Sequence, residues 1–154
     1  GAITRVLAQS LAGRNRLVAC EFLPSFALEL QRRLPEIEVA CCRVQDLPHW
    51  QEAGNKTIVS SLPFRSLAKD EAHAIGLFLQ SEVHKNPQSV LVQFTYGLKN
   101  PIPLLAADAS IESFRHAVVW RNSPPAAVSV GSGAGIGSLK ANLKPLQNPK
   151  HNKK

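Results

Sequence analysis

The sequence contains few of the residues that characterise disulfide-rich, aromatic-cored or membrane-spanning proteins. Its 154 residues include three cysteines, no methionine and 6% aromatic residues. Three cysteines in short apolar runs do not make a disulfide framework, so we expect Cys20, Cys41 and Cys42 to be buried core thiols. No apolar run approaches the roughly 18 residues needed to cross a bilayer, and the first residues do not resemble a secretory signal. We therefore predict one ordinary cytoplasmic domain with a core of Leu, Val, Ile and Ala.

The signatures of several common active sites are also missing. The sequence has no His-Glu-x-x-His spacing, and Cys41, Cys42 and His49 lack the two separated ligand pairs of a structural zinc site. It has neither the Gly-x-Ser-x-Gly turn of α/β hydrolases nor the Gly-x-x-x-x-Gly-Lys-Ser/Thr loop of P-loop proteins. The sequence therefore predicts no metal site and argues against these two enzyme classes.

Acidic residues are absent from the C-terminal segment, residues 131–154. This segment carries five lysines, whereas residues 1–130 hold 13 basic and 11 acidic side chains, so the body contributes only +2 to the formal charge of +7. A segment rich in Gly, Pro, Asn and Lys buries too little apolar surface to offset the entropy of ordering the chain. We predict a folded domain over residues 1–130 and a disordered tail over 131–154, which either solubilises the protein or attracts anionic lipid or RNA.

The apolar pattern of the body predicts helices and strands in alternation. Four continuous apolar runs are typical of strands buried in a parallel sheet: residues 17–20, 39–44, 57–61 and 89–95. Apolar residues at helical spacing predict helices over residues 3–11, 24–34 and 72–83. This order predicts an α/β fold with a doubly wound, mostly parallel, Rossmann-like sheet. Two further β-rich segments, residues 114–120 and 126–130, predict a C-terminal antiparallel strand pair.

Polar residues that follow the first two strands are candidates for binding a nucleotide-like cofactor. Ligands of open α/β sheets bind beyond the carboxyl ends of the strands. Glu21 comes directly after the first run, where a carboxylate can accept hydrogen bonds from both hydroxyls of an adenosine ribose. Asp46 follows the second run and can accept a hydrogen bond from an adenine amino group, with Leu47 covering the ring. The alternatives are a solvent-facing Glu21 and an Asp46 that caps the next helix.

Residues that follow the third and fourth strands are candidates for a reaction pocket. Ser60, Pro63 and Phe64 follow the third run, and Tyr96 follows the fourth. A proline fixes the turn, an aromatic face attracts a cation or an amine, and hydroxyls can hold an amine while its lone pair faces an electrophile. The alternatives are an ordinary loop with Phe64 packed in the core, and a Tyr96 that lies at the edge of the sheet.

Six segments at these positions together resemble one protein family. The first three are Glu21-Phe22-Leu23-Pro24-Ser25-Phe26-Ala27, Val44-Gln45-Asp46-Leu47 and Val59-Ser60-Ser61-Leu62-Pro63-Phe64. The more distinctive ones are Val92-Gln93-Phe94-Thr95-Tyr96-Gly97, Asn100-Pro101-Ile102-Pro103 and Trp120-Arg121-Asn122-Ser123-Pro124-Pro125-Ala126-Ala127-Val128. Over residues 1–130 they resemble the bacterial phospholipid N-methyltransferase family, whose members are class I S-adenosylmethionine-dependent methyltransferases.

The resemblance implies a cofactor, a substrate and a place of action. It implies that S-adenosyl-L-methionine is held by Gly1, Glu21, Asp46 and Leu47. It implies that the accepting amine is held by Ser60, Pro63, Phe64 and Tyr96. The implied reaction is methylation of phosphatidylethanolamine toward phosphatidylcholine, without a metal, by a protein that touches the anionic surface of the inner membrane from the cytoplasm. Nucleic acid is not an expected partner, and the sequence does not indicate an oligomeric state.

The sequence departs from this family at its N-terminus. Family members carry a first strand and a glycine-rich loop, and this chain begins with what resembles the last glycine of that loop, Gly1. We therefore expect an N-terminally truncated methyltransferase domain that lacks its central strand. Two alternatives stay open. Ser61-Leu62-Pro63-Phe64 also resembles the Asn-Leu-Pro-Tyr/Phe motif of rRNA adenine dimethyltransferases, and a chain without the loop can be a non-catalytic relic.

Overall fold

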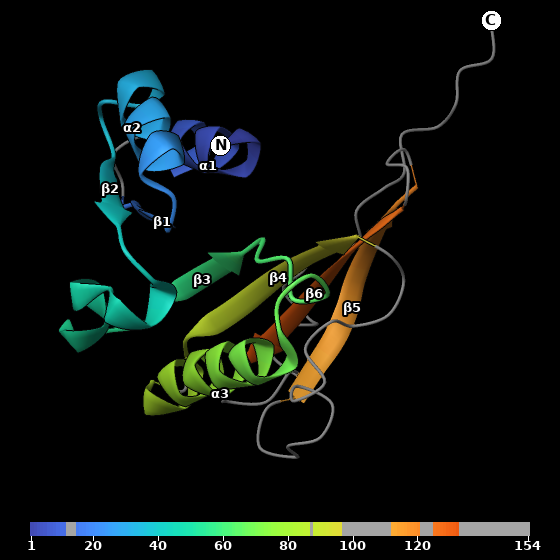
Figure 1. Ribbon diagram of the computed structural model, residues 1–154. Coiled ribbons are helices and arrows are strands. Elements are labelled where there is room, and N and C mark those ends of the chain that lie inside the picture. The colour runs from blue at the N-terminus through green and yellow to red at the C-terminus, as the bar shows by residue number, and fades with distance from the viewer. Residues whose placement is uncertain (12–14, 87, 97–111, 121–124, 133–154) are drawn as a thin grey trace, which may run out of the picture. The chain divides into compact units, whose positions relative to one another are not determined.

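The computed structural model describes residues 1–11, 15–86, 88–96, 112–120 and 125–132 (Figure 1). The chain divides into two compact units, Gly1–Glu52 and Ala53–Lys154. Among the described helices, none is long and apolar enough to cross a membrane. The motifs predicted over residues 100–103 and 121–124, and the tail from residue 133 onward, lie outside the described residues.

The first unit contains two helices and a parallel strand pair. Its elements are α1 (Ala2–Leu11), β1 (Val18–Glu21), α2 (Pro24–Arg33), β2 (Glu38–Cys41) and two short 3-10 helices, η1 (Val44–Asp46) and η2 (Pro48–Gln51). Pro24 stands in the first turn of α2, where its missing N–H leaves no helical hydrogen bond unmade. The pairing runs from Val18 opposite Glu38 to Glu21 opposite Cys41, so both strands end at the same edge. These elements confirm the predicted helix-strand-helix-strand order.

The core of the first unit lies between α2 and the strand pair. Leu30, Leu34 and Ile37 are buried together. Four partly buried apolar residues pack against them: Ala8, Leu17, Ala19 and Val39. The stripe predicted on α1 is less buried than expected, because Ile3 and Val6 are exposed and no residue of α1 is fully buried. Ala8 is the α1 residue that packs against this core.

The prediction of three buried core thiols is wrong in part. Cys41 is exposed, and Cys20 and Cys42 are only half-buried. Two paired strands cannot shield both of their faces, and side chains alternate between the faces along a strand. All three cysteines are free thiols.

The second unit combines one helix with a four-stranded sheet. Its elements are β3 (Thr57–Ser60), α3 (Lys69–Lys85), β4 (Val90–Tyr96), β5 (Glu112–Val119) and β6 (Ala126–Ser132). The strand order is β3-β4-β6-β5, as the ribbons of Figure 1 show. β3 and β4 are parallel, with Ser60 opposite Gln93, whereas β6 is antiparallel to both of its neighbours. The predicted antiparallel C-terminal pair is therefore confirmed.

The observed sheets refine the predicted fold. The architecture is mixed α/β, with one parallel pair in each unit and two antiparallel pairings around β6. β6 includes Gly131 and Ser132, the first two residues of the predicted disordered tail, because both pair with β4 and are buried. β2 ends at Cys41, and the chain turns into η1 where the prediction continued the strand. One continuous doubly wound sheet through both units stays a prediction.

Replacing a buried leucine of α2 tests the core of the first unit. Leu30 is 5% exposed and Leu28, two positions earlier on the same helix, is 74% exposed. We expect Leu30→Ala to lower the free energy of unfolding by about 2–5 kcal/mol, because it removes apolar contacts and leaves a cavity. The matched Leu28→Ala should change it by less than about 0.5 kcal/mol. Urea unfolding followed by circular dichroism measures both values, and equal losses would contradict this core.

Candidate functional site

The carboxyl edge of the first parallel pair presents an acid, as predicted. Glu21 is the last residue of β1 and lies opposite Cys41, the last residue of β2. The backbone N–H of Cys42 donates to the Glu21 carbonyl over 3.1 Å, which ties the two strand ends together. The Glu21 residue is half-buried. Glu21 thus stands at the edge of the pair where ligands of parallel α/β sheets bind, and its contact with a ribose stays a prediction.

An aromatic ring and a guanidinium flank Glu21. Phe22 follows it directly and is exposed, and the Arg43 guanidinium carbon lies 5.7 Å from the centre of the Phe22 ring. Such a cation–π contact contributes about 0.5–1 kcal/mol at an exposed site. It links the segment after β1 to the segment after β2. Sequence reasoning missed Arg43, although a basic residue inside the second apolar run, residues 39–44, is a usable signal.

Asp46 and Leu47 lie in the two short helices that follow β2. The backbone N–H of Asp46 donates to the Arg43 carbonyl over 3.0 Å, and the Asp46 side chain is exposed. Leu47 is half-buried and precedes η2 as its N-cap residue, with no side-chain cap. The alternative in which Asp46 caps the next helix is therefore wrong. Trp50 fixes this turn, because its indole Nε1–H donates to the Val44 carbonyl over 2.5 Å.

Gly1 lies at the start of α1 and close to α2. Its carbonyl accepts the Arg5 N–H over 3.0 Å as the first helical hydrogen bond. A Cβ atom on Gly1 would lie 3.1 Å from Cδ1 of Leu30, tighter than an ordinary contact. A larger residue at this position therefore requires the Leu30 side chain to shift. Together with Glu21, Asp46 and Leu47, this places all four predicted cofactor residues in the first unit.

The four residues predicted to hold an amine all lie in the second unit. Ser60 ends β3, opposite Gln93 in β4, and Tyr96 ends β4. The Ser60 hydroxyl is buried and accepts the Leu62 N–H over 3.4 Å. The parallel pairing therefore brings Ser60, the loop after it and Tyr96 to one edge of the sheet.

Gln93 holds the loop after β3 against β4. Its side chain is 0% exposed, and its Nε2 donates to the Phe94 carbonyl over 2.7 Å and to the Leu62 carbonyl over 3.4 Å. Its Oε1 is buried without a partner among the described residues. Sequence reasoning included Gln93 in a motif without a role, although a polar residue at the centre of an apolar strand is a signal for such a link.

The aromatic residues of this edge differ in exposure. Phe64 is 6% exposed, which agrees with the alternative that its ring packs in the core, and Pro63 beside it is exposed. Tyr96 is 57% exposed and stacks edge to face on Phe94, with ring centres 5.3 Å apart. Arg65 Nη1 donates to the Tyr96 carbonyl over 3.5 Å. The Tyr96 side chain is therefore accessible to a ligand. The role of Phe64 in an amine pocket stays a prediction.

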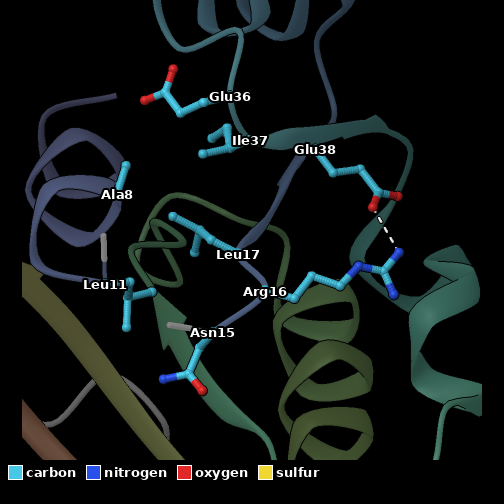
Figure 2. Close-up of a pocket in the computed structure, with 8 residues that line it drawn as sticks. All are labelled: Ala8, Leu11, Asn15, Arg16, Leu17, Glu36, Ile37 and Glu38. Atoms are coloured by element: carbon cyan, nitrogen blue, oxygen red, sulfur yellow. Dashed lines mark hydrogen bonds and ion pairs between the residues drawn. The ribbon is translucent and has the colours of Figure 1, made fainter. Parts of the chain in front are cut away.

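In the first unit, a pocket of about 340 Å³ lies at the amino edge of the β1–β2 pair, opposite the edge that carries Glu21 (Figure 2). Its walls come from α1 and from the residues at the amino ends of β1 and β2. They are Ala8, Leu11, Asn15, Arg16, Leu17, Glu36, Ile37 and Glu38. The pocket is thus separated from Glu21 by the length of β1, and it does not belong to the predicted cofactor site.

Charged residues beside this pocket form one cluster around Arg16. Its guanidinium donates to Glu38 and to Glu52, each over 2.7 Å at the shortest, and Nε2 of the half-buried His49 lies 2.7 Å from Glu38 Oε1. The hydrogen bond from Arg16 is the main reason that the pKa of Glu38 is lowered. The pKa of Arg16 is raised in turn, mainly by Glu38 and then by Glu52. The cluster joins residues before β1, at the start of β2 and after η2. Within the described residues, no group of three or more His, Cys, Asp or Glu side chains is placed to hold a metal ion.

Comparisons with known proteins give a distant likeness in structure. No protein-family model matches the sequence, and no curated protein matches it. A solved structure, "Crystal structure of 23S rRNA methyltransferase ErmE", superposes with a TM-score of 0.46 at 12% sequence identity. The match covers 82% of this chain and 57% of that structure's chain, so this chain spans little more than half its length. A likeness at this level does not establish a family or a substrate.

Replacing Arg16 tests the charge cluster. We expect Arg16→Gln to raise the pKa of Glu38 toward its ordinary value of about 4.3, because the main hydrogen bond that lowers it is lost. Because the pKa of Glu38 is lower in the folded state than in the unfolded state, its contact with Arg16 stabilises the fold at pH values above the unfolded-state pKa. This stabilisation is lost as the pH falls through the folded-state pKa. Carboxyl NMR titration measures the shift. Glu29, whose pKa of about 2 is set by Arg32 and Arg33, is the internal control and should not move.

Proposed function

We propose that this chain is part of a class I S-adenosylmethionine-dependent N-methyltransferase. The observation that carries the proposal is the edge at which Glu21 and Cys41 end two adjacent parallel strands. In α/β sheets of this type, an acid after a strand binds the ribose of a nucleotide-like cofactor at that edge. The resemblance over residues 1–130 assigns Glu21 to the same role.

The first unit offers groups for three polar parts of the cofactor, namely the ribose, the adenine amino group and the carboxylate. Glu21 would accept hydrogen bonds from the ribose hydroxyls, and Asp46, which is exposed, would accept one from the adenine amino group. Leu47 would cover one face of the ring. The N–H groups of the first turn of α1, beside Gly1, carry the partial positive charge that attracts a carboxylate. Bound there, S-adenosylmethionine supplies an electrophilic methyl group.

The resemblance assigns the accepting amine to residues that all lie in the second unit. Tyr96 is exposed at the end of β4, and the loop after Ser60 is held by the Ser60 hydroxyl and by Gln93. A neutral amine attacks a sulfonium methyl group through its lone pair, so placing the amine in line supplies most of the rate. Ser60 and Gln93 would act by fixing the loop, and Tyr96 by orienting the substrate. The reaction does not need a catalytic triad.

Two amines are candidates for the acceptor. The motifs of residues 1–130 favour phosphatidylethanolamine, and the body's net charge of +2 is low for a protein that binds the RNA backbone. Ser61-Leu62-Pro63-Phe64 favours an rRNA adenine. The 23S rRNA methyltransferase that this chain distantly resembles in structure acts on RNA by its name, but its TM-score of 0.46 is too low to decide between the two acceptors.

Cofactor binding is the first test. We expect this chain to bind S-adenosylmethionine weakly, and a chimera that adds a family member's first strand and glycine-rich loop before Gly1 to bind it. In the chimera, Glu21→Ala should weaken binding by about 1–3 kcal/mol, because a charged acceptor for two hydroxyls is lost. Glu36→Ala, at the opposite edge of the strand pair, is the matched control and should have no effect. Calorimetry measures all four proteins.

The outcomes of this titration are distinct. A chimera that folds but does not bind the cofactor would contradict the methyltransferase proposal. A chimera in which Glu21→Ala and Glu36→Ala bind equally would leave Glu21 as a solvent-facing acid and overturn its assignment to the ribose.

The acceptor is decided by competition. We expect the chimera, given labelled S-adenosylmethionine with phosphatidylethanolamine liposomes and rRNA together, to label the lipid. Heat-denatured chimera is the control. Label in the RNA alone would replace the lipid with an rRNA adenine, and label in neither, from a chimera that binds the cofactor, would favour a non-catalytic relic.

A further inference from the structure

Two thiols from separate segments meet beside the carboxyl edge of the first parallel pair. Cys20 Sγ lies 3.8 Å from Cys42 Sγ and donates to the Cys42 carbonyl over 3.4 Å. Cys20 is in β1 and Cys42 follows β2, and both residues are half-buried. In a disulfide the sulfur atoms lie about 2.05 Å apart. From their separation of 3.8 Å, the two sulfur atoms therefore have to move closer by less than 2 Å.

We propose that Cys20 and Cys42 form a reversible dithiol–disulfide site that exchanges with a small-molecule disulfide such as glutathione disulfide. The proposal does not depend on the methyltransferase activity. Two observations support it besides the distance between the sulfur atoms. The backbone N–H of Cys42 is already bonded to the Glu21 carbonyl, so the two segments are held together before any bond forms. The third cysteine, Cys41, is exposed, and its thiol donates to the Phe22 carbonyl over 4.0 Å instead of joining the pair.

The surroundings of the two thiols set the order of the steps. The pKa of the Cys20 thiol is raised to about 12, mainly by burial and then by the hydrogen bond and charge of Cys42. Cys20 is therefore protonated near neutral pH, and Cys42 is the thiol that reacts first. The Cys42 thiolate attacks glutathione disulfide, forms a mixed disulfide and releases one glutathione thiolate.

Internal closure follows on the mixed disulfide. Burial still raises the pKa of Cys20 at this stage, but the 3.8 Å separation of the two sulfur atoms places Cys20 beside the mixed disulfide, so the fraction of Cys20 that loses its proton reacts within the molecule. The Cys20 thiolate then attacks the Cys42 sulfur and releases the second glutathione thiolate. The two protons lost by the protein thiols pass to the two glutathione molecules, so one disulfide has been reduced and one formed.

The test measures thiols and mass in a chain with the Cys41→Ser change, which removes competing adducts. Incubation with glutathione disulfide at neutral pH should consume both remaining thiols, lower the mass by two hydrogen atoms and join the peptides that contain Cys20 and Cys42. A further Cys20→Ser change should stop the reaction at a stable glutathione adduct on Cys42. A further Cys42→Ser change should slow the reaction about tenfold or more, because burial still raises the pKa of the remaining thiol, Cys20.

The outcomes separate the site from incidental reactivity. Circular dichroism shows whether each variant is folded, and a comparison of closure in buffer and in urea needs no variant beyond Cys41→Ser. Closure about tenfold faster in buffer than in urea would support a site built by the fold. Equal rates in buffer and urea, or a glutathione adduct on Cys42 that persists without closure while Cys20 is present, would overturn the proposal.

Discussion

Parallel pairing of adjacent strands is the constraint on which both candidate sites depend. Parallel strands end at the same edge of a sheet, so whatever follows each strand is brought to that edge. The pairing of Glu21 with Cys41 does this in the first unit, and the pairing of Ser60 with Gln93 does it in the second. The connection between paired strands is a helix in each case, α2 or α3. The location proposed for each site therefore follows from strand direction, whereas its chemistry depends on the side chains at that edge.

The edge of the second unit shows how a strand can position a loop. Gln93 is fully buried in β4 and donates to the carbonyl of Leu62, which belongs to the loop after β3. A buried amide without such a partner would cost free energy, so the bond favours one position of the loop. Apolar packing of the buried Phe64 holds the same loop two residues further on. The first unit uses a different device, the stacking of Arg43 on Phe22 at its surface.

Most helices and strands could be predicted from the sequence, because periodic apolar residues report directly on burial. The spacing in residues 72–83 predicted α3, and the apolar run in residues 89–95 predicted β4. The placement of Glu21 at a strand end also follows from the sequence, since an acid after an apolar run marks where burial stops. The exposure of Cys41 could not be predicted, because it depends on how many strands pair beside β2. The contact between Arg43 and Phe22 is likewise a product of three-dimensional packing.

The position of the two tryptophans has a practical consequence. Trp50 lies in the first unit, half-buried and hydrogen-bonded to the Val44 carbonyl, whereas Trp120 follows β5 in the second unit and is 65% exposed. Indole fluorescence shifts to longer wavelength when a shielded ring enters water, and a ring that is already in water shows little shift. The emission spectrum of this protein should therefore report unfolding of the first unit almost alone. Tryptophan fluorescence thus monitors the unfolding of the unit that contains Glu21 separately from that of the unit that contains Tyr96.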